Sequence, residues 1–146
     1  PNKIIPAWKV KTDPYYAQYF VKQSGLADWY NKSWYAHTSP ASSLQPSNGY
    51  VAPPLDGIWA TAPYLHNGSI PTLEGVLDSR VRPDFWEKTE AYDPERMGWV
   101  YISHKKGKGR KVYDTSLPGY GNQGHYYGDE LDTEQRKAVM AYLKTL

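Results

Sequence analysis

The stretch GYVAPPLDGIWATAPYLHNGSIPTLEGVL, residues 49–77, decides how the middle of the chain can fold. Five residues that break helices lie between positions 50 and 70: Pro53, Pro54, Gly57, Pro63 and Gly68. Proline removes a backbone donor and collides with the preceding helical turn, so no long helix can form here. We expect a winding segment with one short turn at 55–61. From position 71 onward, Leu73, Val76 and Leu77 form the apolar side of a predicted short helix.

The segment KTDPYYAQYFVKQ, near the start of the chain, carries signals for the beginning of a helix. Thr12 or Asp13 can cap this helix, and Pro14 fits its first position. Three aromatic side chains then fall on one face: Tyr16, Tyr19 and Phe20. We expect Gly25 to end the helix, and the Ser- and Pro-rich residues 37–50 to form a loop.

The last segment, ELDTEQRKAVMAYLKTL, predicts a terminal helix over residues 132–146. Asp132 can cap the helix and Gln135 completes a capping box. Glu134 in the first turn and Lys144 in the last turn suit the helix dipole. Four apolar residues recur at helical spacing: Val139, Tyr142, Leu143 and Leu146.

Residues 80–124 have an irregular pattern with two alternating apolar segments, WVYIS and KVYDT, around a glycine-bearing tip. This arrangement predicts a β-hairpin insertion at 99–115. Five cations lie in its tip: Lys105, Lys106, Lys108, Arg110 and Lys111. They form either an ordinary solvated loop or a docking patch for an acidic redox partner.

The composition fits one domain of 146 residues with a core. Tyr and Trp dominate its apolar content, with 14 Tyr and 6 Trp against 2 Phe, which suits cofactor sites and polar-walled pockets. The net charge of +2 is too small to indicate nucleic-acid binding. No apolar run approaches the roughly 20 residues of a membrane span. The absence of cysteine excludes disulfides, thiolate metal sites and a CxxCH haem attachment within this chain.

Two of the four histidines have informative surroundings, although no pair has the spacing of a zinc site. His125 lies among glycines just before the terminal helix, where the backbone can bend tightly and approach a flat ligand. It is either a surface residue or a metal ligand. His66 precedes an Asn-Gly turn. Its ring either bonds a backbone carbonyl or serves a haem as ligand, propionate contact or proton carrier.

Two long segments resemble a known family. YVAPPLDGIWATAPYLHNGSIPTLEGVLDSRVRPDFW (50–86) and YDTSLPGYGNQGHYYGDELDTEQRKAVMAYLKTL (113–146) resemble the C-terminal haem domain of multi-haem c-type cytochrome oxidoreductases. These enzymes form the di-haem cytochrome c peroxidase superfamily, and the likeness is strongest to its rubber-oxygenase-like branch. The resemblance implies a mostly α, loop-rich, cytochrome c-like partial domain over residues 1–146, with a β-hairpin insertion. It also implies a periplasmic or secreted location.

The resemblance implies roles for particular residues. Cytochrome c domains carry an axial ligand on a loop before a final helix, and here that position corresponds to His125, with Met97 as its thioether rival. It places His66 beside the haem without ligating the iron. Trp59 and Tyr64 would line the haem pocket. Arg80 and Arg82 would pair with haem propionates, or else form ordinary surface salt bridges.

The family's CxxCH motif has no counterpart in this chain. Three explanations stay open: the chain is the C-terminal part of a larger polypeptide, the domain has lost its haem, or haem binds without covalent attachment. The first implies haem c attached through cysteines outside this chain, and an upstream haem-bearing part or companion chain as partner. The leading function is then a portion of a haem-dependent oxidoreductase, peroxidase- or oxygenase-like. The alternatives are a non-enzymatic electron-transfer subunit and a haemless, aromatic-rich binding module.

Overall fold

The computed structural model describes residues 3–146, so the first two residues of the predicted 1–146 domain lie outside it. The expectation of a mostly α chain is wrong. The described part is 35% helical and 19% strand, with two antiparallel sheets, and is therefore a mixed α/β structure. Its α-helices are α1 (Ala7–Val10), α2 (Tyr15–Lys22), α3 (Ser24–Lys32), α4 (Leu73–Leu77) and α5 (Thr133–Leu143). Its strands are β1 (Ile4–Pro6), β2 (Gly49–Val51), β3 (Phe85–Asp93), β4 (Gly98–Ser103) and β5 (Val112–Asp114).

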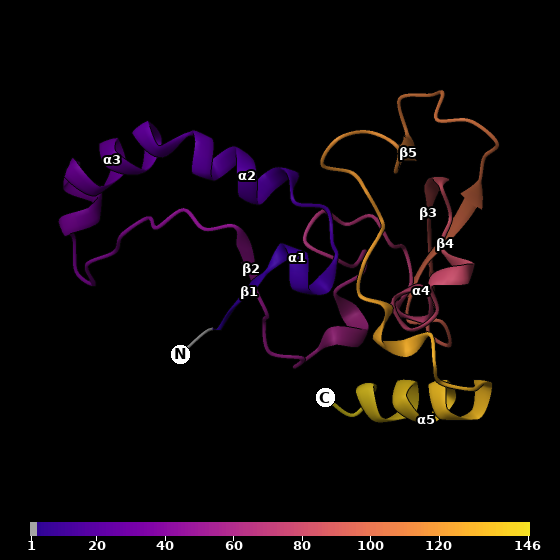
Figure 1. The fold of residues 1–146 in the computed structure, drawn as a ribbon. Coiled ribbons are helices and arrows are strands. Elements are labelled where there is room, and N and C mark those ends of the chain that lie inside the picture. Colours follow the sequence, from indigo (N-terminus) through magenta and orange to yellow (C-terminus); the bar gives the residue numbers. More distant parts are fainter. Residues whose placement is uncertain (1–2) are drawn as a thin grey trace.

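Helices α2 and α3 form an arm that extends away from the rest of the molecule (Figure 1). The Asp13 carboxylate accepts the first N–H of α2, from Tyr15, at 2.8 Å, so Asp13 acts as the predicted helix start signal. Gly25 does not end the helix as expected, because it lies inside α3. Residues 38–48 contain no helix or strand, and they run back along α3, where Asn31 exchanges two hydrogen bonds with the Leu44 backbone.

The body of the molecule contains a three-stranded antiparallel sheet in the order β4-β3-β5. The predicted hairpin at 99–115 is therefore wrong in its pairing, because its two apolar segments lie on opposite sides of β3 and do not pair with each other. Trp86 in the central strand faces Ser103 on one side and Tyr113 on the other. The sequence did not predict β3, because FWEKTEAYD contains several charged residues and Trp86 is its one buried side chain.

The hydrophobic core lies between the winding segment, α4 and the terminal helix. Its buried members are Tyr64, Ile70, Leu73, Met97 and Leu143. The final helix thus packs on residues of this chain. Both halves of the predicted capping box are formed at the start of α5. Only part of the predicted apolar stripe faces inward, because Tyr142 remains exposed.

Four 3-10 helices connect these elements: η1 (Trp34–His37), η2 (Ile58–Ala60), η3 (Ser79–Val81) and η4 (Tyr126–Gly128). The short turn expected at 55–61 corresponds to η2, and the short helix expected after position 71 corresponds to α4. Within residues 3–146, no helix combines the length and the apolar character needed to cross a membrane.

A buried carboxylate connects α4 to the terminal helix. Asp78 follows α4 and accepts two hydrogen bonds from the Arg80 guanidinium, both at 2.7 Å. Arg136 of α5 approaches the same carboxylate to 3.4 Å. The Arg80 bonds, with Arg136 adding to them, lower the pKa of Asp78 to about 2.

The low pKa of Asp78 predicts a loss of stability in acid. A carboxyl group whose pKa is lower in the folded state stabilises the fold above its unfolded pKa, near 4, and loses this effect as the pH falls towards 2. We expect Asp78→Asn to cost about 1–2 kcal/mol at pH 6, after allowance for the exposure of Arg80, and almost nothing at pH 2. Urea unfolding across this range measures the difference, with the exposed Asp56→Asn as control. Equal costs at both pH values would contradict the assignment.

Candidate functional site

A loop at residues 119–125 forms the centre of the site, and side chains distant in sequence hold it. The Asp13 carboxylate accepts the backbone N–H groups of Gly119 and Gly121, each at 3.1 Å. The Asn67 side-chain amide donates to the carbonyl oxygens of the same two glycines, at 3.1 and 2.9 Å. The loop is therefore fixed from the helix start at Asp13 and from the turn after His66.

His125 lies at the end of this loop in a left-handed conformation, with φ of 54°. Its N–H donates to the Val10 carbonyl at 2.9 Å. The preceding Gly124 has φ of 88°, and a Cβ there would lie 2.5 Å from the Val10 oxygen and 2.6 Å from the Thr12 nitrogen. The loop thus passes so close to residues 10–12 that only glycine fits before His125.

The imidazole of His125 is partly buried, and no hydrogen bond to its ring is formed by the part of the chain that the structure describes. Burial lowers the pKa of His125, and the nearby positive charge of Arg82 lowers it further. Both effects favour the neutral form of the ring, which keeps a free lone pair. This is the form of histidine that binds a metal.

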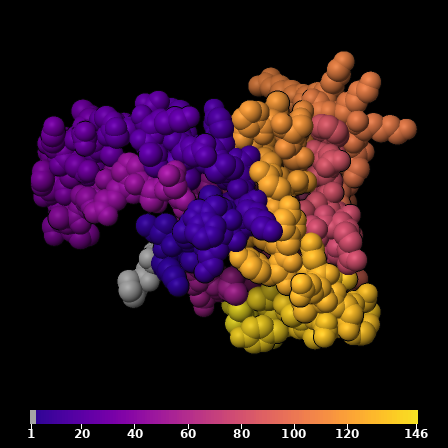
Figure 2. Space-filling view, viewed as in Figure 1, coloured from indigo at the N-terminus to yellow at the C-terminus, as the bar shows by residue number. Residues whose placement is uncertain are grey.

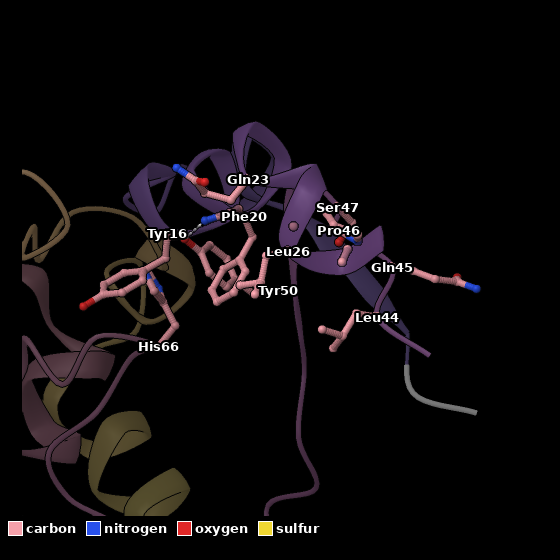
Figure 3. Close-up of a pocket in the computed structure, with 13 residues that line it drawn as sticks. Tyr16, Phe20, Gln23, Leu26, Leu44, Gln45, Pro46, Ser47, Tyr50 and His66 are labelled. Carbon is pink, nitrogen blue, oxygen red and sulfur yellow. Dashed lines mark hydrogen bonds between the residues drawn. The ribbon is translucent and has the colours of Figure 1, made fainter. Parts of the chain in front are cut away.

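His66 lies at one end of a groove of about 380 Å³ between α2, α3 and residues 44–50 (Figure 3). Tyr50 stacks on its ring with centroids 3.9 Å apart, and Tyr16 meets it edge-on at 6.2 Å. The ring is still exposed, yet partial desolvation lowers its pKa, an effect that Asp13 opposes and the imidazole of His125 reinforces. The structure thus brings the two predicted histidines within electrostatic reach of each other.

A second groove, of about 260 Å³, lies beside His125. Its lining residues are Lys9, Val10, Lys11, Tyr126, Tyr127 and Glu130. His125 lines neither groove. Its backbone is bonded to Val10 and continues into Tyr126, and both of these residues line the second groove.

The two predicted pocket aromatics lie away from this loop. Tyr64 is 6% exposed and belongs to the core, where its hydroxyl lies 2.8 Å from the Met97 carbonyl oxygen. Trp59 in η2 is exposed, and its carbonyl accepts a hydrogen bond from the Tyr92 hydroxyl. Met97 itself is 1% exposed, so its thioether is enclosed by the core.

The two predicted propionate partners already have partners within the protein. Arg80 is exposed and directs two N–H groups at Asp78. Arg82 is partly buried and donates to five backbone carbonyl groups: those of Gly75, Val76, Asn122, Gly124 and His125. Arg82 therefore acts on the loop of His125 in this structure.

The cationic tip at residues 105–111 projects from the sheet, in orange at the upper right of Figure 2. Its five cations are exposed, and none forms an ion pair with another described residue. The docking of a redox partner on this tip stays a prediction.

The donor set limits the kind of metal site that the chain can offer. Residues 3–146 hold no group of three or more His, Asp or Glu side chains placed to bind a metal ion. A haem iron has a smaller requirement, because the porphyrin supplies four nitrogens and the protein supplies one or two axial ligands. A single free, neutral imidazole such as that of His125 fits this second kind of site.

Part of the chain matches a known family model. Residues 49–87 match a family model described as RoxA-like, cytochrome c-like. The matched segment is similar to this family. It runs from β2 through α4 to the start of β3, and it contains His66, Asn67 and Arg82. The RoxA-like segment supports the resemblance to the rubber-oxygenase-like branch, and it implies haem binding and a cytochrome-related role.

Two curated relatives come from Sinorhizobium fredii (strain NBRC 101917 / NGR234), and both are uncharacterized proteins. Protein y4iJ is 40% identical over 116 residues, which cover 72% of this chain and 19% of y4iJ. Protein y4iM is 40% identical over 97 residues, which cover 62% of this chain and 21% of y4iM. The chain therefore spans about a fifth of the length of the curated relatives that it matches.

Sequence reasoning missed the residues that hold the loop. Asp13 was expected only as a helix cap, and Asn67 only as part of a turn. Arg82 was expected to bind propionate or to lie on the surface. The one usable signal was the accumulation of glycines at 119–128, because backbone that winds through glycines leaves N–H and carbonyl groups needing partners.

Proposed function

We propose that this chain is a portion of a periplasmic multi-haem c-type cytochrome oxidoreductase, in which His125 supplies the distal axial ligand of an electron-transfer haem. The haem c would be attached through cysteines outside this chain, since the sequence contains none. The observation that carries the proposal is the partly buried imidazole on a loop held by Asp13, Asn67 and Arg82. When bound, the haem would supply the one-electron redox chemistry of its iron.

Burial and the charge of Arg82 favour the unprotonated form of His125, which is the form that binds iron. An axial imidazole must be unprotonated at the nitrogen that binds the metal, and a low pKa keeps it so at neutral pH. A ligand held on an ordered backbone also needs less rearrangement when the metal binds. The hydrogen bonds to Val10 and the tight passage of Gly124 provide this order.

His66 has a different place in the proposal. One face of its ring is covered by Tyr50, whose hydroxyl donates to the Asp13 carbonyl at 2.8 Å. His66, Tyr50 and Asp13 therefore join the groove to the loop of His125. We assign His66 to the pocket wall and leave the iron to His125.

The arm supports a partner in the form of the haem-bearing remainder of the protein or a companion chain. Nine large apolar side chains of the arm and of the adjoining η1 turn are each between 39% and 69% exposed: Tyr15, Tyr16, Tyr19, Phe20, Val21, Leu26, Trp29, Trp34 and Tyr35. Large exposed apolar patches mark interaction sites in soluble proteins. The arm extends outward (Figure 2), where a neighbouring domain could cover it.

The substitution His125→Ala tests the proposal in the haem-loaded native protein. A haem iron with imidazole on both sides is low-spin, so loss of one axial imidazole is expected to convert one haem to the high-spin state. Absorption and electron paramagnetic resonance spectra measure this change. His37→Ala, on the exposed η1 turn, is the control and should leave the spectra unchanged. Persistent low-spin signals for every haem in His125→Ala would end the proposal, and their loss in His66→Ala instead would transfer the role to His66.

A further inference from the structure

The guanidinium of Arg82 binds the two segments that meet behind His125. Its Nε donates to the Gly75 carbonyl of α4 at 2.7 Å. One terminal nitrogen, Nη1, donates to the carbonyls of Asn122 and Gly124, both at 2.8 Å. The other, Nη2, lies 3.4 Å from the carbonyls of Val76 and His125. Three short bonds and two long ones thus join the end of α4 to the loop.

These contacts use every donor that arginine has. A guanidinium carries five N–H groups, and here five carbonyl oxygens receive them. No carboxylate among residues 3–146 forms an ion pair with Arg82. A haem propionate could bind this side chain only by displacing a carbonyl group. The geometry therefore favours a role within the protein over a role at the cofactor.

The carbonyls that Arg82 binds would otherwise lack partners. The short helix α4 ends at Leu77, so its last carbonyl groups have no N–H donor from a following helical turn. The loop at 122–125 likewise belongs to no helix or strand before η4 begins at Tyr126. The planar guanidinium has donors in several directions and can bind the carbonyls of α4 and of the loop at the same time, whereas the single ammonium group of lysine cannot.

The loop backbone that Arg82 binds has positive φ values, which residues other than glycine rarely adopt. Gly124 and His125 both have positive φ values, 88° and 54°. A non-glycine residue with positive φ persists only where its surroundings enforce it. At His125 the enforcing contacts are the N–H bond to Val10 and the carbonyl contacts from Arg82 on the opposite side.

We infer that Arg82 is the positioning residue of His125: its bonds to the carbonyls of 122, 124 and 125 fix the direction in which the imidazole points. The statement that the positioned imidazole binds iron rests on the proposed function, whereas the bonds from Arg82 hold the loop whatever the imidazole binds. Asp13 and Asn67 fix the earlier part of the loop, at 119 and 121. Arg82 fixes the part that carries the histidine.

Arg82 also lies beside the side chain that follows His125. Tyr126, the next residue, places its ring 5.5 Å from the guanidinium carbon. The guanidinium therefore meets both the loop carbonyls and the aromatic ring of the residue that follows His125.

Arg82→Lys and Arg82→Gln in the complete haem-loaded protein test the inference. Lysine keeps the charge but loses the fork, and glutamine loses both. We expect hydrogen exchange at the His125 amide to accelerate at least about tenfold in both variants, because charged hydrogen bonds to its loop are lost. We also expect part of one haem to become high-spin, and added imidazole to restore the low-spin spectrum. Arg96→Lys is the matched control, since Arg96 is a partly buried arginine that binds Glu74 of α4 and does not contact the loop.

The two readouts separate this inference from the proposed function. If His125→Ala changes the haem spectrum while both Arg82 variants leave the exchange rate and the spectrum like those of Arg96→Lys, the positioning role is wrong. If the Arg82 variants accelerate exchange but neither they nor His125→Ala alter any haem, the loop role stands and the ligand assignment is wrong. Should Arg82→Gln not fold, Arg82→Lys and its exchange rate decide the question.

Discussion

Trp86→Ala is expected to lower the free energy of unfolding by about 3–5 kcal/mol, the cost of emptying a large aromatic site in a core. Trp86 is 3% exposed and stacks on Tyr113 with centroids 5.3 Å apart. Its indole N–H donates to the carbonyl of the fully buried Ser69 at 3.1 Å, so alanine also leaves a buried acceptor without its donor. Because Trp86 lies in the central strand β3, its loss affects both neighbouring strands.

Chemical denaturation followed by far-ultraviolet circular dichroism measures this change. Trp29→Ala is the matched control, because Trp29 lies on α3 and is 60% exposed. Surface substitutions of this kind usually change stability by less than about 0.5 kcal/mol. A cost below about 1 kcal/mol for Trp86→Ala would mean that β3 does not hold the sheet together as the structure shows.

The second large effect is expected at Gly124→Ala. An alanine Cβ would lie 2.5–2.7 Å from backbone atoms of Val10, Lys11 and Thr12, and the residue would have to keep a φ of 88°. The left-handed conformation alone costs a non-glycine residue about 1–2 kcal/mol, and the clash must also break the bond between His125 and Val10. We expect a total loss near 3 kcal/mol, together with conversion of the His125-ligated haem to the high-spin state.

Gly25→Ala provides the comparison for this substitution. A Cβ at Gly25 meets no atom within 4 Å, and Gly25 lies inside the helix α3. Alanine there should stabilise the protein by about 0.5–1 kcal/mol, the difference between the two residues in a helix interior. Urea unfolding of both variants gives the contrast. Similar stabilities for Gly124→Ala and Gly25→Ala would show that the loop does not pass residues 10–12 as closely as described.

Local features of the fold could be predicted from the sequence, and distant ones could not. The start of α5 could be read because Asp132 and Gln135 bond to backbone only three residues away. Strand β3 was missed because its partners lie on two separate segments and most of its side chains remain accessible. A strand that is buried at one position gives little alternation to read.

The candidate site shows the same division. The choice of His125 as a candidate ligand rested on the glycines around it and on a family resemblance, and it stays a prediction. The roles of Asp13 and Arg82 could not follow, since Asp13 binds residues 106 and 108 positions away and Arg82 binds carbonyls 40–43 positions away. A backbone carbonyl has no sequence signature, so a side chain that binds carbonyls cannot be paired with them by inspection of residue types.

The long reach of Asp13 has a consequence for the order in which the protein is made. Ribosomes release the N-terminal end first, and domains fold as units when enough chain has emerged. Asp13 therefore emerges more than a hundred residues before Gly119 and Gly121, whose N–H groups it binds. The helix that begins after Asp13 can form early, but Asp13 can bind the loop before His125 only after those later residues have emerged. Because contacts of wide sequence separation carry a large entropic cost of loop closure, we expect the loop of His125 to become ordered after the local helices.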